Sequence, residues 1–276
     1  MKLKVLLDNK TETPDVNAEW GLSVLIEADG LKIVYDLGTT DMVMDNAEVM
    51  NVDMEDVDAV AISHGHFDHT GGIPAFCQVN SKAKIYIHKN AFSVFHGKEN
   101  GVIDDYNCGI LIPKNELDRL KDRFVLTDGI TKLSDSIIIS GTIPDVPGTV
   151  PTEPFFIEKE DGTIIEDDLS HEQFMVIRNG DKGLFILDGC SHKGILPAIK
   201  YAQKIFPGEK IQGIFAGLHM FPAGDKEINS AIQNIEEYNP DIIMPVHCTG
   251  MKAICMFKQY FGDRCLVASA GDMYEF

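Results

Sequence analysis

The sequence predicts an α/β fold in which helices cover β-sheets. Apolar segments of strand length alternate with segments whose apolar residues recur at helical intervals, and four of the predicted strands end in side chains that can bind metal ions. These strand ends come from distant parts of the chain and would need one another to complete one site. We therefore predict a single domain that spans residues 1–276.

The first half of the chain is predicted to contain a hairpin and a buried strand. Residues 22–27 and 32–35 are apolar strands joined by the turn Ala28-Asp29-Gly30. Residues 40–57 are polar, yet their apolar side chains keep helical spacing. Residues 59–62 are continuously apolar, which is typical of a strand that is buried on both faces. Further strands are predicted at residues 2–7, 58–63 and 84–88.

The second half continues the alternation of strands and helices. A second hairpin is predicted at residues 174–187, with a turn rich in glycine and polar residues. Two amphipathic helices follow it, at residues 197–206 and 225–238, and each leads into a strand. The strands predicted for this half are residues 137–141, 174–177, 184–187, 211–216 and 242–244, and residues 142–155 form a Pro-rich connection.

Residues from about 89 to 123 lack a clear period. Phe92, Phe95 and Tyr106 are interleaved with glycines and Pro113, and a loop of this length inside a compact domain is usually functional. We predict a cap-like insertion that offers apolar and aromatic contacts to a substrate. The alternative, an irregular edge of the core, explains the same composition equally well.

The composition restricts the classes of partner. The formal net charge of −19 argues against nucleic acid, because binding a polyanion requires Lys and Arg to neutralise phosphates. A small phosphorylated ligand needs only a local cation or a metal ion. The six cysteines form no Cys-x-x-Cys pair, the first residues do not resemble a signal peptide, and no apolar run has the length of a membrane span. These features predict a cytoplasmic protein with a small anionic substrate and no membrane partner.

The segment directly after the buried strand is the most informative part of the sequence. Its metal-binding side chains are His64, His66, Asp68 and His69. His64 and His66 are two residues apart and would point the same way in an extended chain, so one ion could bind both. Asp68 and His69 follow in the turn and could reach a second ion. Imidazole and carboxylate are ligands of Zn²⁺, Fe and Mn²⁺, and two-metal hydrolytic sites hold their ions about 3.5–4 Å apart.

The pattern His-x-His-x-Asp-His-x-Gly-Gly, complete in residues 64–72, resembles the signature of the metallo-β-lactamase superfamily. Other segments are similar to its dihydropteroate-synthase-like branch, which includes a synthase of a dihydropterin–ribofuranosylaminobenzene 5′-phosphate. These segments are Leu7–Thr11, Leu187–Ile195, Ala216–Met220 and Pro245–Gly250. The resemblance extends from about residue 3 to about residue 272. It implies a four-layer αββα sandwich with metal ions at one edge of the two facing sheets.

The resemblance implies three ligands beyond the motif. His247 follows a predicted strand and matches the late histidine of the superfamily. Near the 174–187 hairpin two interpretations stay open. Cys190 and His192 lie two residues apart, on one side of an extended chain, and the branch resemblance favours them. His171 precedes the hairpin in a polar run that is expected near the surface. We predict His192 as a ligand and keep Cys190 and His171 as candidates.

The resemblance also implies a mechanism. His219 follows a strand, like a histidine that contacts the scissile phosphate in phosphodiesterases of the superfamily, and it forms the predicted catalytic pair with Asp68. The plainer interpretation of His219 is a core histidine beneath the site. Two divalent metal ions would activate a water molecule; Zn²⁺ fits the ligands best, and Fe or Mn would also be accepted. Asp36 is expected to cap a turn or orient a ligand histidine.

The predicted activity is metal-dependent hydrolysis of a small anionic substrate, either a phosphoester or a pterin-related compound. The alternative hypothesis is a di-iron redox protein related to the flavodiiron metal domain. Those proteins carry a flavodoxin-like domain after the metal domain, and no such segment is found before Phe276. Redox chemistry is therefore the weaker hypothesis.

Overall fold

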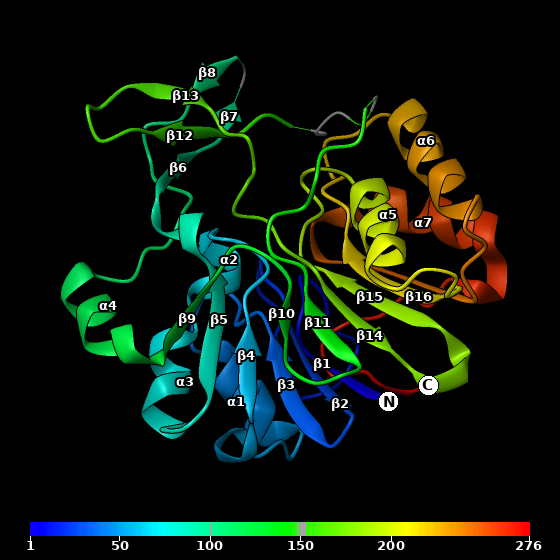
Figure 1. Ribbon diagram of the computed structural model, residues 1–276, viewed down its shortest axis with the longest axis horizontal. Coiled ribbons are helices and arrows are strands. Elements are labelled where there is room, and N and C mark those ends of the chain that lie inside the picture. The colour runs from blue at the N-terminus through cyan, green and yellow to red at the C-terminus, as the bar shows by residue number, and fades with distance from the viewer. Residues whose placement is uncertain (100, 148, 150–152) are drawn as a thin grey trace.

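The computed structural model of the protein describes residues 1–99, 101–147, 149 and 153–276. Residue 100 of the predicted insertion and residues 148 and 150–152 of the predicted Pro-rich connection lie outside the described residues. Two β-sheets face each other, and helices cover the outer face of each (Figure 1). The predicted four-layer α/β sandwich is confirmed.

The first sheet has seven strands in the order β18-β1-β2-β3-β4-β5-β9. Neighbouring strands are antiparallel from β18 to β3 and parallel from β3 to β9. The strands are β1 (Lys2–Leu7), β2 (Ser23–Ala28), β3 (Leu31–Tyr35), β4 (Ala59–Ala61), β5 (Lys84–His88), β9 (Phe124–Thr127) and β18 (Met273–Glu275).

The second sheet has six strands in the order β10-β11-β14-β15-β16-β17. Its last three strands are parallel, so their carboxyl ends meet at one edge. The strands are β10 (Thr131–Lys132), β11 (Ile137–Ile139), β14 (Met175–Arg178), β15 (Leu184–Asp188), β16 (Ile211–Gly217) and β17 (Ile242–Val246). β17 runs through Pro245, which is tolerated because this strand lies at the edge of its sheet.

Three apolar layers hold the sandwich together. Between the sheets, Phe185, Phe215 and Met244 pack against Val24 and Tyr35. Outside the first sheet lie α1 and α3, and outside the second lie α5, α6 and α7. The helices are α1 (Met42–Val49), α2 (Phe67–Thr70), α3 (Ile73–Val79), α4 (Lys114–Leu120), α5 (Ile195–Ile205), α6 (Asp225–Glu236) and α7 (Gly250–Phe261). No helix among the described residues is long and apolar enough to cross a membrane.

Several helices differ from the sequence prediction. α5 begins at Ile195, two residues before the predicted start at residue 197. Pro197 therefore lies in the first turn, where its missing N–H breaks no helical hydrogen bond. α2, α3, α4 and α7 were not predicted, although α7 follows directly on the segment Pro245–Gly250 that had been singled out for its motif.

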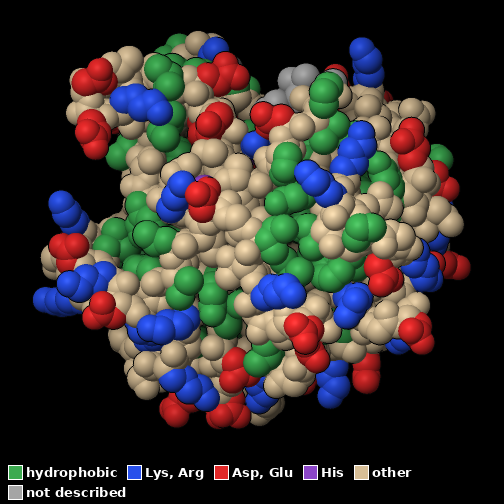
Figure 2. Space-filling view, viewed as in Figure 1, with side chains coloured by type: hydrophobic (Ala, Val, Ile, Leu, Met, Phe, Trp, Pro, Cys, Tyr) green, Lys and Arg blue, Asp and Glu red, His purple; other side chains and the backbone are tan. Residues whose placement is uncertain are grey.

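The predicted insertion at residues 89–123 divides into two parts. The first part contributes to a lobe that stands off from the body of the molecule (Figures 1 and 2). A distant segment completes this lobe, because β12 pairs with β6 and with β13. In the second part, Ile112, Leu117 and Leu120 pack against the outer core of the first sheet. The lobe strands are β6 (Val94–His96), β7 (Lys98–Glu99), β8 (Val102–Ile103), β12 (Phe156–Glu158) and β13 (Ile164–Glu166).

Glycines of the His-rich motif lie where another backbone segment comes too close for a side chain. A Cβ at Gly71 would overlap the carbonyl group of Thr39, and a Cβ at Gly65 would overlap the backbone of Ala91. Backbone atoms cannot rotate away as a flexible side chain can. The close approach lets Gly71 N–H donate to the Gly38 carbonyl at 2.8 Å, which fixes the motif loop beside the end of β3.

We expect Gly71→Ala to lower the free energy of unfolding by about 1–3 kcal/mol, because the new methyl group must force two backbone segments apart. Gly129→Ala is the matched control, since a Cβ there meets no atom within 4 Å. Its effect should stay within about 0.5 kcal/mol. Urea denaturation of both variants measures the difference, and equal stabilities would contradict the close approach.

Candidate metal centre

The ends of four strands meet at one edge of the sandwich. The His-rich segment follows β4, the segment Gly189–His192 follows β15, His219 follows β16 and His247 follows β17. Strands that run in the same direction deliver their carboxyl ends to a common edge, where α/β proteins usually bind ligands. The structure brings together seven predicted site residues, namely His64, His66, Asp68, His69, His192, His219 and His247.

His64, His66 and His192 form a first donor set. One potential ligand atom from each lies within 4.8 Å of the others. The Nε2 atoms of His64 and His192 are 3.3 Å apart. His66 Nε2 and His192 Nδ1 are buried without a hydrogen-bond partner. Buried polar atoms rarely lack a partner, so His66 Nε2 fits an ion held among the three rings together with the facing Nε2 atoms of His64 and His192.

Asp68, His69 and His247 form a second donor set, again with ligand atoms within 4.8 Å of one another. Asp68 Oδ2 lies 3.3 Å from His247 Nε2, and Asp68 Oδ1 lies 3.8 Å from His69 Nε2. His247 Nε2 has no hydrogen bond of good geometry. All three side chains are buried. Imidazole and carboxylate donors of this kind fit Zn²⁺, Fe or Mn²⁺.

Cys190 lies between the two donor sets. Its Sγ atom is 3.2 Å from His69 Nε2 and falls within 4.8 Å of ligand atoms of both His64 and His69. The side chain is buried and belongs to no disulfide. The sequence left Cys190 and His171 as candidate ligands near the hairpin. Of these two, Cys190 is placed where its sulfur could bind an ion in either donor set.

The outer nitrogen atoms of His69 and His64 are held by polar partners. His69 Nδ1 donates to Asp36 Oδ2 at 2.7 Å, and His64 Nδ1 donates to Ser63 Oγ at 2.8 Å. Ser63 Oγ in turn donates to Asp36 at 2.7 Å. These hydrogen bonds leave the Nε2 atoms of both rings facing inward, as metal-binding histidines require. The contact predicted for Asp36, with a histidine of the motif, is therefore present.

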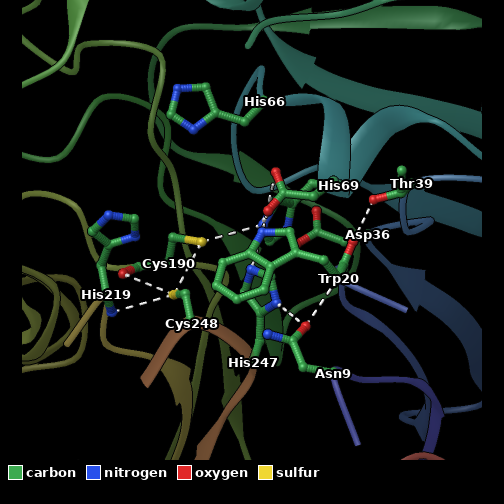
Figure 3. A network of polar contacts seen from close by, with 12 residues as sticks. Asn9, Trp20, Asp36, Thr39, His66, His69, Cys190, His219, His247 and Cys248 are labelled. Atoms are coloured by element: carbon green, nitrogen blue, oxygen red, sulfur yellow. Dashed lines mark hydrogen bonds and ion pairs between the residues drawn. The ribbon is translucent and has the colours of Figure 1, made fainter. Parts of the chain in front are cut away.

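His247 is held in the same way from the opposite side (Figure 3). Its Nδ1 atom donates to Asn9 Oδ1 at 2.8 Å, and its backbone N–H donates to Asp8 Oδ1 at 2.8 Å. Asn9 also accepts the backbone N–H of Gly21 at 3.0 Å, which fixes the amide. The Leu7–Thr11 segment thus supplies the support for a ligand-type histidine more than two hundred residues further along the chain.

The charges at the site differ between the two donor sets. Burial lowers the pKa of the three histidines of the first set well below the usual range, and the neighbouring imidazoles add to this effect. They are therefore neutral, which is the form that binds metal. Burial also lowers the pKa of His69, but Asp36 and Asp68 outweigh it and raise that pKa to about 9. The carboxylates favour a positive charge here, whether a proton or a metal ion.

His171 does not join either donor set. Its Nδ1 atom accepts the backbone N–H of Gly65 at 3.1 Å, and its Nε2 atom donates to Asp167 at 3.0 Å. Both ring nitrogens are thus engaged, and the ring stacks on Phe95. The expectation that this polar run lies near the surface holds only in part, because Glu166 and Asp168 are exposed whereas His171 and Glu172 are buried. His171 supports the turn of the motif, and we leave it out of the proposed ligands.

Glu172 holds the loop that carries His192. Its two carboxylate oxygens accept the backbone N–H groups of His192 and Lys193, the latter at 2.9 Å. The side chain is completely buried, and a buried carboxylate needs such donors. Sequence reasoning missed this role because the residue belongs to a polar run with no metal-binding pattern.

His219 lines the site without belonging to the two main donor sets. Its Nε2 atom donates to Glu153 Oε2 at 3.1 Å, while Nδ1 is buried without a partner. Its ring lies 4.5 Å from that of His192 and 5.6 Å from that of Phe155. Burial lowers the pKa of His219, but its interactions with Cys248 and Glu153 outweigh this effect and raise that pKa to about 10. Glu153 was not predicted, because nothing near it in the sequence indicates a site.

A pocket of about 390 Å³ opens over the donor atoms. Aromatic side chains from several segments form its walls, and Trp20 and Phe221 meet edge to face at 5.4 Å. The first part of the insertion closes one side. The lining residues are Trp20, His66, Phe67, Asp68, Gly97, Lys98, Asp104, Tyr106, Cys108, Glu153, Phe155, Cys190, His192, His219, Phe221 and Cys248.

The chain is similar to known proteins over nearly its whole length. The family model of the metallo-beta-lactamase superfamily matches residues 21–133, which include the His-rich motif. The 7,8-dihydropterin-6-methyl-4-(beta-D-ribofuranosyl)-aminobenzene-5'-phosphate synthase of Methanocaldococcus jannaschii is 30% identical over 269 residues, which cover 94% of this chain and 90% of that protein. The chain belongs to the metallo-β-lactamase superfamily, and the resemblance to its dihydropteroate-synthase-like branch is confirmed.

Three further proteins are similar to this chain. The uncharacterized protein MJ0448 of the same organism is 29% identical over 260 residues, covering 93% of this chain and 94% of that one. The crystal structure of Tm1679, described as a metal-dependent hydrolase of the β-lactamase superfamily, is 28% identical with a TM-score of 0.85 and covers 100% of this chain and 99% of that chain. YhfI from Bacillus subtilis, at 15% identity and a TM-score of 0.59 over 99% of both chains, shares the fold.

We expect Asn9→Ala to weaken binding of one divalent ion about 10–100-fold, because His247 loses the partner that orients its ring. Asn179→Ala is the control, since Asn179 bonds Gln212 in the turn between β14 and β15. A competition titration with a chromophoric chelator measures both affinities. Unchanged affinity in the Asn9 variant would contradict the orienting role.

Proposed function

We propose that this protein is a metal-dependent hydrolase that acts on a small anionic substrate, either a phosphoester or a pterin-related compound. One observation carries the proposal. Two sets of imidazole and carboxylate donors, His64, His66 and His192 beside Asp68, His69 and His247, converge beside one pocket with Cys190 between them. Several of their nitrogen atoms are buried and lack partners.

Different residues of the chain would have different roles in hydrolysis. Two divalent ions, when bound, would lower the pKa of a water molecule and polarise an oxygen atom of the substrate. Asp68, at the pocket floor, can accept a hydrogen bond from the attacking water and so orient it. His219 can donate a proton to the leaving group or to an oxygen that gains charge, while Glu153 holds its Nε2–H.

The pocket would suit a substrate with a planar ring, and bound metal ions would supply most of the attraction for its anionic group, because the lining carries Asp68, Asp104 and Glu153 against Lys98. Its volume of about 390 Å³ is within the range of small-molecule sites. Trp20, Phe155 and Phe221 offer aromatic surfaces for a ring, and Lys98 is a cation in the lining. A long polyanion is not favoured, since the net charge is −19 and the face in Figure 2 intersperses Lys and Arg with Asp and Glu.

A second candidate function is condensation. The relative from Methanocaldococcus jannaschii is named as a synthase of a pterin-containing phosphate, so an amine could replace water as the nucleophile in the same pocket. The redox alternative gains no support from these comparisons. To separate the first two, the metal-loaded protein is incubated with a pterin-methyl phosphoester, with and without an arylamine. Free alcohol in both reactions indicates a hydrolase, and a new C–N product that forms only with the amine indicates a synthase.

We expect the purified protein to contain two transition-metal ions per chain, with Zn²⁺ favoured by the donors. His66→Ala and Asp68→Ala should each abolish turnover of phosphodiester, lactone or thioester substrates and reduce the metal content, while circular dichroism stays unchanged because the apolar layers hold the fold. Elemental analysis and rate measurements test this. Protein that was never exposed to chelator yet holds no transition metal would contradict the proposal, as would full turnover in either variant.

We expect His219→Ala to keep both ions and to lose roughly 10²–10³ in kcat on phosphoesters, the usual cost of removing one stabilising donor. Glu153→Gln should lose less, because the amide still accepts the Nε2–H of His219. Lactones or thioesters, if turned over, should be affected less than phosphoesters. Loss of metal in the alanine variant would make His219 a ligand, and an equal loss on both substrate classes would remove its phosphate-specific role.

A further inference from the structure

The sulfur of Cys248 points into the metal centre beside Cys190. The two Sγ atoms are 3.3 Å apart, and both side chains are buried and outside any disulfide. The backbone N–H of His219 donates to Cys248 Sγ at 3.2 Å (Figure 3). A hydrogen bond from a backbone N–H stabilises negative charge on its acceptor, so the environment suits a thiolate.

The backbone is shaped to turn Cys248 toward the site. His247 and Cys248 are consecutive residues, which would point to opposite faces in a strand. His247 instead has a φ of 49°, and the chain enters a 3-10 turn at His247–Thr249. Thr249 Oγ1 accepts the backbone N–H of Leu218 at 3.1 Å and so ties this turn to the end of β16. Both neighbours can therefore face the same centre.

The fold also makes room for this sulfur. A Cβ at Gly217 would lie 2.9 Å from Cys248 Sγ and would overlap the carbonyl group of Gly189. With glycine at position 217, the sulfur packs against the ends of β15 and β16 and remains in the pocket lining. Ligand atoms of Cys190, His247 and Cys248 then lie within 4.8 Å of one another, and His247 Nε2 is buried without a hydrogen-bond partner.

We propose that Cys248 is a second sulfur ligand of the metal centre, at the position formed by Asp68, His69 and His247. The inference rests on the proposed metal centre but not on hydrolysis. Two soft thiolates beside imidazole would favour Zn²⁺, Fe²⁺ or Co²⁺ and disfavour Mg²⁺ and Mn²⁺. Sulfur donors from outside the His-rich motif would then determine which metal ion the centre binds.

Cobalt substitution tests the assignment without measuring activity. The protein is stripped with chelator under reducing conditions, loaded with Co²⁺, and its sulfur-to-cobalt charge-transfer band is recorded in the near ultraviolet. Cys248→Ser should lose about a third of the band if Cys190 bridges both ions, and about half if Cys190 binds one. The double variant with Cys190→Ser should lose the band entirely. Cys255→Ser, at an exposed position on α7, is the matched control and should keep it.

An unchanged band in folded Cys248→Ser protein would overturn the proposal while leaving the metal centre in place. Failure of the wild-type protein to bind Co²⁺ would overturn both. If the variant does not fold, alkylation of the wild-type protein with iodoacetamide gives the answer. Mass spectrometry should find Cys248 modified after chelation and protected when Co²⁺ is bound, and equal modification in both states would overturn the assignment.

Discussion

The rest of the site depends on the burial of one carboxylate, that of Asp36 at the end of β3. The side chain is completely buried, a position that is costly for a charged group unless donors surround it. Those donors are the backbone N–H and hydroxyl of Ser63 and the Nδ1–H of His69, all at 2.7 Å. Through Ser63 the same carboxylate also orients His64. One buried charge therefore fixes histidines from both donor sets.

The same arrangement recurs on the other strand ends. Asp8 accepts the backbone N–H of His247, and Glu172 accepts that of His192. Each ligand-type segment is thus attached to a buried carboxylate from a different part of the chain. Backbone N–H groups that would lack partners in these irregular loops are satisfied at the same time. The facing sheets bring the strand ends together, and the buried carboxylates orient the segments that carry the ligand-type side chains.

The sequence was sufficient to predict the fold and to recognise most of the donor residues that the structure brings together, for identifiable reasons. Strands and their ends follow from apolar periodicity, and the His-rich motif lies within a few residues, so its donors could be recognised together. Cys248 could not be predicted, because strand alternation points it away and only the left-handed φ of His247 turns it inward. Glu153 and Glu172 contact the site across the fold and carry no local pattern. The choice between His171 and His192 depends on hydrogen bonds, which only the folded chain shows.

The central claim is that the two donor sets hold a pair of transition-metal ions. Anomalous X-ray diffraction from crystals of protein purified without chelator tests it most directly, with data collected on either side of the zinc, iron and manganese absorption edges. The account predicts two anomalous peaks about 3.5–4 Å apart, one among His64, His66 and His192 and the other among Asp68, His69 and His247, with Cys190 between them. Full occupancy at His171, or no anomalous peak within these donor sets, would contradict it.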